Sequence, residues 1–283
     1  MASQNDIPTK PCIVRGSEPY SLEEQLSGQN RVYRARASDG SLRIVKRYST
    51  NASYLRERHA LETLKATGGH PHLLSHIEFI EGKERYTIFP FIEGRTLHDR
   101  IEEEGTLTEK DITIIFAPIC DAMQAMHEQS LVHRDVKASN ILLGHGRDYT
   151  QTDGIECTIT PYLFDFDITY HNDTAHLEEH NTISGTATHI APENWKGHAP
   201  DPRTDVYAIG ITLYKAATNK IPFVGSIINL MQQHSHMPIP DPRHDNKGIS
   251  DGMRVIIMRC LQKDPDKRYQ SARELKADIE LLR

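Results

Sequence analysis

Cysteine is scarce in this chain, and long apolar runs are missing altogether. The four cysteines among 283 residues lie far apart, and no two have the spacing of a zinc knuckle or a Cys-x-x-Cys redox pair. We therefore expect reduced thiols, as is usual inside cells. No apolar stretch approaches the roughly 18 residues that span a bilayer, and residues 1–10 lack the apolar core of a signal peptide. The sequence predicts a soluble, cytoplasmic protein with no membrane partner.

An excess of positive charge is also lacking. Lysine and arginine total 33 against 39 acidic residues, a net charge of -6, so no nucleic-acid partner is expected. Sixteen histidines are present, but none forms a His-Glu-x-x-His or another tight ligand spacing. We interpret them as surface or capping residues rather than metal ligands. A hydrophobic content of 37% is sufficient for the core of one large domain or of one divided into two lobes.

The secondary-structure signals change character near residue 93. Before it, short β-type runs are predicted with one helix among them; after it, the pattern is helical, with a broad apolar face from Ile112 to Met126. Ser271 and Glu274 have the spacing of a capping box. Strands are expected at about 20–26, 31–37, 42–48, 73–81 and 86–91, and helices at about 53–65, 204–218, 252–262 and 271–283.

These elements predict an α+β, bilobal fold with a cleft between the lobes. A small β-rich lobe is expected over about 20–92 and a larger helical lobe over 93–283, with 1–19 as an N-terminal extension. On the helix of the small lobe, Glu57 shares a face with two leucines, so its charge requires a partner. Lys46, on the strand 42–48, is the natural candidate.

The segment 133–140 reads His-Arg-Asp-Val-Lys-Ala-Ser-Asn and combines an acid, a cation and an amide in one short loop. A second carboxylate follows at Asp165, in the sequence Phe-Asp-Phe-Asp. Phosphoryl transfer consists mostly of positioning and charge neutralisation. One carboxylate orients the attacking hydroxyl, and another is a metal ligand. The two segments together are typical of a phosphotransferase.

With these motifs, the chain resembles the eukaryotic-type (Hanks-type) serine/threonine protein kinase family from about Tyr20 to its end. The resemblance implies transfer of the γ-phosphoryl of ATP to protein hydroxyls, with Mg²⁺ as the ion and Mn²⁺ as an alternative. It implies Asp135 as the base and Lys137 as a contact to the transferred phosphate. It also implies Asn140 and Asp165 as metal ligands. The nucleotide-binding residues that it implies are Lys46, Glu57, Leu26, Gly28, Val32, Pro90, Ile92 and Leu142.

Motifs further along the chain favour a protein substrate with a serine or threonine acceptor over a small molecule. Gly185-Thr186 and Ala-Pro-Glu at 191–193 resemble the end of an activation segment, and 205–210 resembles the helix that anchors the catalytic loop. Arg268 stands where the family pairs an arginine with the glutamate of 191–193. Lys137, two residues after the base, resembles the serine/threonine branch.

Arg134, beside the base, is typical of kinases regulated by phosphorylation of the activation segment, because its guanidinium requires an anionic partner. Thr182 and Ser184 are the main candidate acceptors for autophosphorylation, and Thr174 is a third. Unmodified loop hydroxyls are the alternative for each of them.

Several positions depart from the family pattern. The loop after Leu26 holds one glycine, Gly28, where the family has up to four, and Ile44 replaces a small residue against the adenine. Phe89 falls at the gatekeeper position. Asp167 replaces the glycine of Asp-Phe-Gly, either as a tolerated residue pointing to solvent or as a further charge near the metals.

These departures keep a second hypothesis open, a pseudokinase scaffold that binds a nucleotide or a partner without efficient catalysis. The segment between Asn140 and Asp165 is also longer than is usual in the family. The excess, around 144–161, is expected to form an extended hairpin or loop, either a docking surface or a plain surface insertion.

Overall fold

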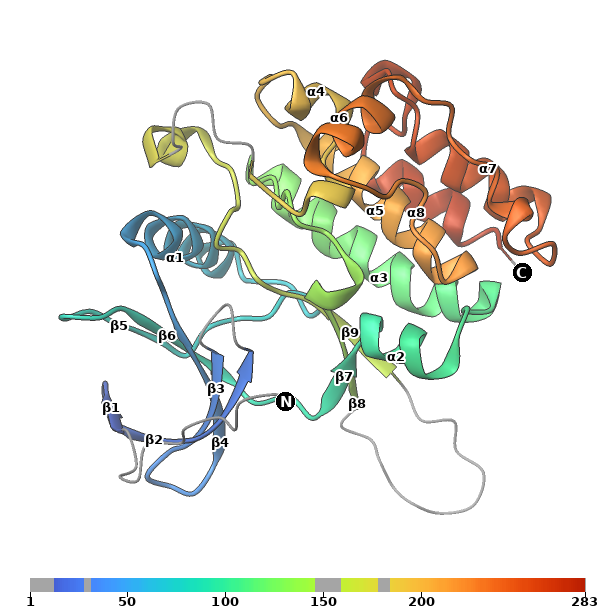
Figure 1. Cartoon of the computed structure of the whole chain (residues 1–283). Coiled ribbons are helices and arrows are strands. Elements are labelled where there is room, and N and C mark those ends of the chain that lie inside the picture. Colours follow the sequence, from blue (N-terminus) through green and yellow to red (C-terminus); the bar gives the residue numbers. More distant parts are fainter. Residues whose placement is uncertain (1–12, 28–31, 146–158, 178–183, 283) are drawn as a thin grey trace, which may run out of the picture.

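The computed structural model of the chain describes residues 13–27, 32–145, 159–177 and 184–282. Figure 1 shows two lobes, one built on a curved β-sheet with the helix α1 beside it, and a larger one built from helices. The predicted α+β, bilobal fold is confirmed. Within the described part of the chain, no helix is long and apolar enough to cross a membrane.

The sheet of the small lobe has the strand order β1-β2-β3-β4-β6-β5, and all neighbours are antiparallel. Its first strand lies before residue 20, where the small lobe was expected to begin, and pairs with β2. The strands are β1 (Ile13–Arg15), β2 (Pro19–Ser27), β3 (Val32–Arg36), β4 (Leu42–Arg47), β5 (Glu78–Ile80) and β6 (Tyr86–Pro90).

The strand predicted over 73–81 is wrong for most of its length, because only Glu78–Ile80 joins the sheet. Leu73 instead forms a parallel bridge to Leu163 of the helical lobe. The Leu74 amide donates to the Leu163 carbonyl at 3.0 Å, and the Leu163 amide donates to the His72 carbonyl at 2.8 Å. An apolar run that reads as one strand therefore serves partly as a connection between the lobes.

The helix of the small lobe, α1 (Asn51–Ala66), begins at Thr50, whose side chain accepts a hydrogen bond from the Ser53 amide. Its inner face buries Leu61 and Leu64, as predicted, and Glu57 is buried with them. A fully buried carboxylate is costly unless it is paired. Glu57 therefore requires a charged or hydrogen-bonding partner close to its carboxylate.

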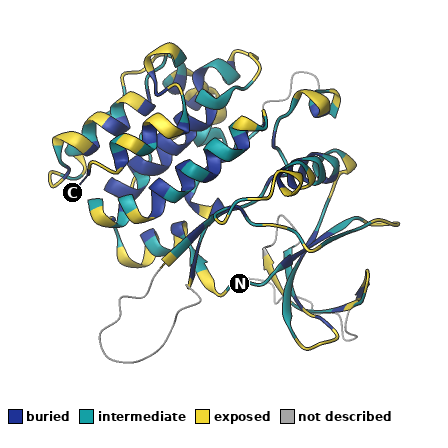
Figure 2. Ribbon diagram, turned by 180° about the vertical axis from the view of Figure 1, so that it is seen from behind, coloured by how far each residue is buried: buried dark blue, intermediate teal, exposed yellow. Residues whose placement is uncertain are grey.

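The helical lobe is built around α3 (Glu109–Glu128) and α5 (Pro202–Thr218). Both helices begin with a capping box, formed by Thr108 with Asp111 and by Asp201 with Thr204. Figure 2 shows buried residues gathered at the centre of this lobe and exposed residues on its outer helices. The other helices are α2 (Leu97–Glu104), α4 (Pro192–Trp195), α6 (Ile227–His236), α7 (Asp251–Cys260) and α8 (Ala272–Ile279).

At the start of α8, Ser271 is the N-cap as expected, and its side chain accepts from the Glu274 amide. The Glu274 carboxylate, however, accepts from the Gln270 amide at 3.0 Å rather than from the cap residue. The predicted helix start is therefore right and the reciprocal half of the capping box is displaced by one residue.

A small second sheet, β7-β8-β9, lies where the lobes meet. It consists of β7 (Gly94–Thr96), β8 (Ile141–His145) and β9 (Ile159–Leu163). β8 and β9 pair antiparallel at the two ends of the segment around 144–161, which was predicted to form an extended hairpin or loop. The rest of the predicted insertion, 146–158, lies outside the described residues, so its role as a docking surface stays a prediction.

Candidate active site

Lys46 joins the two lobes through its ammonium group. Its Nζ lies 2.6 Å from Oε2 of Glu57 on α1, and it also donates to Oδ1 of Asp165, which is 119 residues further along the chain. The Lys46 side chain is 8% exposed and that of Glu57 is 1% exposed, so water screens this ion pair poorly. The predicted pair of Lys46 and Glu57 is thus formed, and a carboxylate from the helical lobe is added to it.

Burial and the neighbouring charges shift the pKa of the Lys46 ammonium group in opposite directions. Burial alone would lower the pKa of Lys46, but the carboxylates of Asp165, Glu57 and Asp167 raise it well above its usual value. For Glu57, burial raises the pKa to about 6, because the attraction of Lys46 is offset by repulsion from the two aspartates. Lys46 therefore stays charged at neutral pH, and Glu57 titrates closer to neutral pH than an ordinary glutamate does.

Tyr48 is a member of this cluster that was not predicted from the sequence. Its hydroxyl donates to Oε2 of Glu57 at 2.5 Å and lies 2.8 Å from Oγ1 of Thr87. Because side chains alternate along a strand, Tyr48 faces the same side as Lys46, and this spacing was the signal that could have identified it. Tyr48 therefore helps to hold the Glu57 carboxylate in place.

Asp135 is the centre of a second cluster, in the loop 133–140. Its Oδ1 accepts from the Thr186 hydroxyl at 2.7 Å, and its Oδ2 lies 2.6 Å from the Lys137 ammonium and 3.0 Å from Nδ2 of Asn140. Burial opposes ionisation here, but Lys137 and the hydrogen bond from Thr186 lower the pKa of Asp135 below its usual value. The carboxylate is therefore ionised at neutral pH and oriented by three side chains.

Asp205 of α5 holds the loop 133–140 in place through hydrogen bonds to its backbone. Its two carboxylate oxygens accept from the backbone amides of His133 and Arg134, at 2.9 and 2.8 Å. Nε2 of His127, at the end of α3, lies 2.8 Å from Oδ2 of Asp205 and was not predicted from the sequence. Arg134 has a positive φ of 67°, a strained conformation for a side-chain residue. The buried carboxylate thus fixes a loop whose backbone would otherwise relax.

Phe166 and Asp165 point in opposite directions. Phe166 is fully buried, with its ring 5.3 Å from that of His133, while the Asp165 side chain faces Lys46. Asp165 has a positive φ of 74°, in the left-handed region that favours glycine. The strained residue of the triplet is thus Asp165, the candidate metal ligand, and not Asp167. Position 167 can therefore carry a side chain where the family has glycine.

The idea that Asp167 points to solvent is wrong. Its Oδ2 lies 3.8 Å from Nζ of Lys46, and its carbonyl accepts from Nε of Arg56 at 2.9 Å. Burial raises the pKa of Asp167, and repulsion from Asp165 adds to that effect against the attraction of Lys46. The substitution therefore places a third carboxylate around a single lysine.

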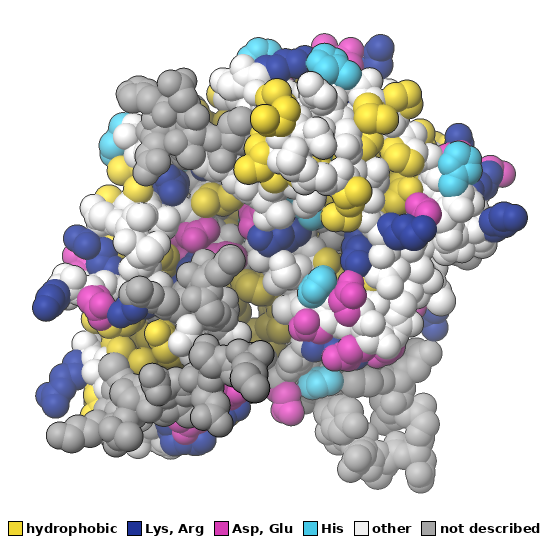
Figure 3. All heavy atoms as spheres, in the orientation of Figure 1, with side chains coloured by type: hydrophobic (Ala, Val, Ile, Leu, Met, Phe, Trp, Pro, Cys, Tyr) yellow, Lys and Arg dark blue, Asp and Glu magenta, His cyan; other side chains and the backbone are white. Residues whose placement is uncertain are grey.

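Most of the residues predicted to enclose a nucleotide lie on β2, β3, β4, β6 and β8 or next to these strands. Figure 3 shows the surface hollowed between the two lobes. Val32 pairs in register with Lys46, and Pro90 ends β6 opposite Arg43. Ile44 and Phe89 face each other on β4 and β6, with Phe89 4% exposed. Ile92 approaches the backbone of β8, Leu142 lies on that strand, and Leu26 is 48% exposed near the end of β2. Gly28 lies outside the described residues.

The predicted activation segment contacts the loop 133–140 at Gly185-Thr186. Gly185 has a φ of 116°, and a side chain there would approach the Arg134 carbonyl to 3.0 Å, so glycine is required at this position. Ser184 is described and half-buried, whereas Thr182 lies outside the described residues. Thr174 is buried, and its hydroxyl donates to the His171 carbonyl at 3.1 Å, which disfavours it as an acceptor.

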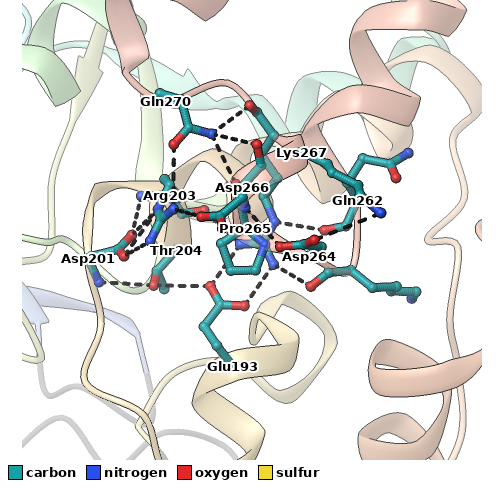
Figure 4. Close-up of polar contacts among 12 residues, drawn as sticks. Glu193, Asp201, Arg203, Thr204, Gln262, Asp264, Pro265, Asp266, Lys267 and Gln270 are labelled. Atoms are coloured by element: carbon teal, nitrogen blue, oxygen red, sulfur yellow. Dashed lines mark hydrogen bonds and ion pairs between the residues drawn. The ribbon is translucent and has the colours of Figure 1, made fainter.

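The glutamate of 191–193 forms the pair predicted with Arg268. The guanidinium of Arg268 donates to both carboxylate oxygens of Glu193 at 2.7 Å. Figure 4 shows Glu193 reaching from the start of α4 toward the segment around Pro265 and Gln270. The end of the activation segment is therefore attached to the core of the helical lobe.

Comparison with known proteins identifies the class to which this fold and site belong. The family model described as "Protein kinase domain" matches residues 31–278, and the chain belongs to this family. A crystal structure described as "Rad53 kinase domain and SCD2" is similar to it with a TM-score of 0.71, over 93% of this chain and 89% of that one. Its sequence identity of 23% shows a shared fold alone.

The sequence relatives are named as serine/threonine-protein kinases. A probable serine/threonine-protein kinase of Clostridium perfringens, CPE1738, is 29% identical over 263 residues, which is 90% of this chain and 37% of the relative. Serine/threonine-protein kinase PknB of Mycobacterium tuberculosis is 30% identical over 239 residues, 80% of this chain and 35% of the relative. The chain therefore spans little more than a third of the length of these relatives.

Proposed function

We propose that this chain is a protein kinase that uses ATP and Mg²⁺ to phosphorylate serine or threonine side chains of proteins. The observation that carries the proposal is that both charged clusters are formed together. Lys46 contacts Glu57 and Asp165 while Asp135 contacts Lys137 and Thr186. Phosphoryl transfer needs this simultaneous positioning of cations and carboxylates more than any covalent chemistry of the protein.

In this proposal Asp135 orients the hydroxyl of the acceptor and takes up its proton. Its lowered pKa keeps the carboxylate ionised, and the hydrogen bond from Thr186 fixes its direction. Lys137 lies 2.6 Å from the same carboxylate, so its ammonium group is close enough to neutralise charge on the phosphoryl group in transit. Lys46 would bind the phosphates that remain with the nucleotide.

Asn140 and Asp165 fit the role of Mg²⁺ ligands, because both offer hard oxygen atoms. Nδ2 of Asn140 donates to the Asp135 carbonyl and carboxylate, which leaves the amide oxygen as the ligand atom. Asp165 is held by Lys46 beside the same region. The ion would neutralise phosphate charge, and Mn²⁺ accepts the same ligand types. The side chains of Val32, Ile92 and Leu142, with the backbone at Pro90, would enclose the adenine.

The pseudokinase alternative has no specific observation in its favour. The degenerate glycine loop after Leu26 and the residue Asp167 motivated it, but Lys46, Asp135 and Asp165 are all retained. A small-molecule phosphotransferase is disfavoured by the segment 185–193 and its attachment through Arg268. Both alternatives remain outcomes of the activity test.

The test is transfer of radiolabelled phosphate from ATP to a generic protein substrate. Asp135→Asn keeps the size of the side chain and removes the base, so we expect a loss of about 10²–10⁴ in rate. Lys46→Met should lose a comparable factor, whereas Lys83→Met, which changes an exposed lysine, should leave the rate unchanged. Equal labelling by all four proteins would refute the assignment. If none of the four proteins transferred the label, the pseudokinase hypothesis would be favoured.

Autophosphorylation at Thr182 or Ser184 is part of the proposal. Nε of Arg134 donates to the Ile168 carbonyl at 2.6 Å, on the part of the activation segment that leads toward these acceptors. After incubation with ATP and Mg²⁺, mass spectrometry should detect phosphate on one of the two residues and none in Asp135→Asn. An unmodified wild-type protein that still phosphorylates other substrates would contradict this regulation but not the activity.

A further inference from the structure

Three potential metal ligands meet where α1 faces the activation segment, away from both charged clusters. Nε2 of His59 on α1 lies 3.1 Å from Nδ1 of His171, and that Nδ1 lies 3.6 Å from Oδ2 of Asp173. The ligand atoms of all three residues lie within 4.8 Å of one another. His59 and His171 are 112 residues apart, so their meeting is a product of the fold.

The spacings of His171 to the other two ligands fit a small tetrahedral ion. With metal–ligand bonds of about 2.0–2.1 Å, two ligands of a tetrahedral site are separated by roughly 3.3 Å. The observed 3.1 and 3.6 Å lie on either side of that value. Two imidazoles and one carboxylate are a common ligand set for Zn²⁺ with a fourth position open to water.

The surroundings suit an ion that enters from solvent. The Asp173 side chain is 74% exposed and that of His171 is 17% exposed, so one side of the cluster is open. Burial, with a smaller effect of His171, lowers the pKa of His59, which favours the neutral imidazole that can bind a metal. The rings of His59 and His171 are tilted by 43° with centroids 4.7 Å apart.

A capped turn is the competing explanation for the same contacts. The Asp173 amide donates to Nδ1 of His171 at 3.1 Å, at the start of the short helix η2 (Asn172–Leu177). Nδ1 has a single lone pair, and both this amide and His59 approach it. A bound ion would replace these two contacts at Nδ1 of His171.

We propose that His59, His171 and Asp173 form a binding site for a divalent transition-metal ion of the zinc class. The ion would join α1 to η2, two elements that lie side by side in Figure 1. Because α1 also carries Glu57, an occupied site would restrain the helix that holds the Lys46 ion pair. Mg²⁺ prefers oxygen ligands, so the ion required for phosphoryl transfer would not compete for this site.

The test uses the full chain without an affinity tag, and Zn²⁺ alone as the ligand. Isothermal titration in excess Mg²⁺ should give one Zn²⁺ per chain, and Co²⁺ should give the strong visible absorption of a tetrahedral site. His59→Gln and His171→Gln should each weaken binding by about 100-fold or more, and Asp173→Asn by about 10-fold. The matched control is His70→Gln with His72→Gln, a second histidine pair with ring centroids 5.7 Å apart, and it should bind as the wild type does.

Thermal unfolding keeps the result interpretable. Zn²⁺ should raise the Tm of the wild type and of the His70/His72 control, and not that of the three ligand variants. Asp173→Asn changes an exposed side chain, so it remains informative if a histidine variant does not fold. Wild-type affinity in any well-folded histidine variant, loss of binding in the control alone, or no binding of micromolar Zn²⁺ by the wild type would overturn the proposal. None of these measurements depends on kinase activity, so failure of this site and failure of the proposed function are distinguishable.

Discussion

Arg268 and Glu193 connect two parts of the chain that are 75 residues apart through two parallel hydrogen bonds of 2.7 Å. The Arg268 side chain is fully buried, and its guanidinium also donates to the carbonyls of Gln262, Arg203 and Lys263. It lies over the ring of Tyr207 at 4.8 Å. All five N–H donors of the planar guanidinium are used here, which a lysine would not reproduce.

Arg268→Met should therefore destabilise the protein strongly. Removing one partner of a buried pair leaves the Glu193 carboxylate without compensation, and we expect a loss of about 3–5 kcal/mol in the free energy of unfolding. The control is Arg273→Met, because Arg273 is 74% exposed and its pair with Glu128 contributes about 0–1 kcal/mol. Urea denaturation measures both. Equal losses in the two variants would show that the buried Arg268–Glu193 pair contributes no more to stability than the exposed pair does.

The raised pKa of Glu57 predicts a dependence of stability on pH. Its pKa is about 6 in the folded chain against a usual value of 4.5, so the folded state binds more protons between these two pH values. Stability contributed by protonated Glu57 is present below about pH 4.5 and is lost as the pH rises to about 6. The wild type should lose on the order of 2 kcal/mol relative to Glu57→Gln across that window.

Urea denaturation at several pH values, in both proteins, measures this difference. The comparison cancels the titrating groups that do not interact with Glu57, because these change equally in the two chains. A difference that stays constant would mean that the attraction of Lys46 balances the burial of the carboxylate. If the wild type instead gained stability relative to Glu57→Gln as the pH rises, the attraction would outweigh the burial.

Asp167 should affect the metal requirement of the reaction. Its carboxylate lies 3.8 Å from Nζ of Lys46 and competes with Asp165 for that ammonium group. Asp167→Asn keeps the size and removes one negative charge near the proposed ion, so we expect the half-saturating Mg²⁺ concentration to rise by on the order of 10-fold. Asp167→Gly, which restores the residue of the family, should shift it in the same direction. Mg²⁺ titrations that superimpose on the wild type would leave Asp167 without a role at the metal.

Thr186 should be a positioning residue for Asp135. Its hydroxyl donates to Oδ1 of Asp135 and accepts from Nζ of Lys137, each at 2.7 Å. Hydrogen bonds to charged groups contribute about 1.5–3 kcal/mol, so Thr186→Val should lower kcat by roughly 10- to 100-fold. Thr186→Ser should restore most of the rate.

Thr188→Val is the matched control for this experiment. Thr188 lies in the same segment, and its hydroxyl contacts Nδ1 of its neighbour His189 instead of the catalytic loop. If Thr188→Val and Thr186→Val lower kcat to the same extent, the effect belongs to the segment as a whole. A change in KM without a change in kcat would also contradict the positioning role.

Most of the fold was predictable because its signals are local. Alternation predicted β2, β3, β4 and β6, and apolar periodicity predicted the buried faces of α1 and α3. The predicted strand 73–81 failed because Leu73 pairs with Leu163 in the other lobe, a contact that no local pattern encodes. Tyr48 was missed although strand alternation places it beside Lys46, and His127 was missed because nothing near it in the sequence indicates Asp205.

The sequence by itself determined which side chains carry charge and in what order they follow one another. The loop 133–140, Lys46, Glu57 and Asp165 were sufficient for the resemblance to protein kinases, because the chemistry of phosphoryl transfer needs those residue types. It also located Arg268 as the partner of Glu193, on the pattern of that family.

Only the tertiary structure decided where the remaining charges point. It turned Asp167 toward Lys46 instead of solvent, and it brought together His59 and His171, which are 112 residues apart. The physical reason is that ion pairs and ligand clusters depend on distances of a few ångströms. Such distances between remote residues are set by the packing of the two lobes and leave no periodic trace in the sequence.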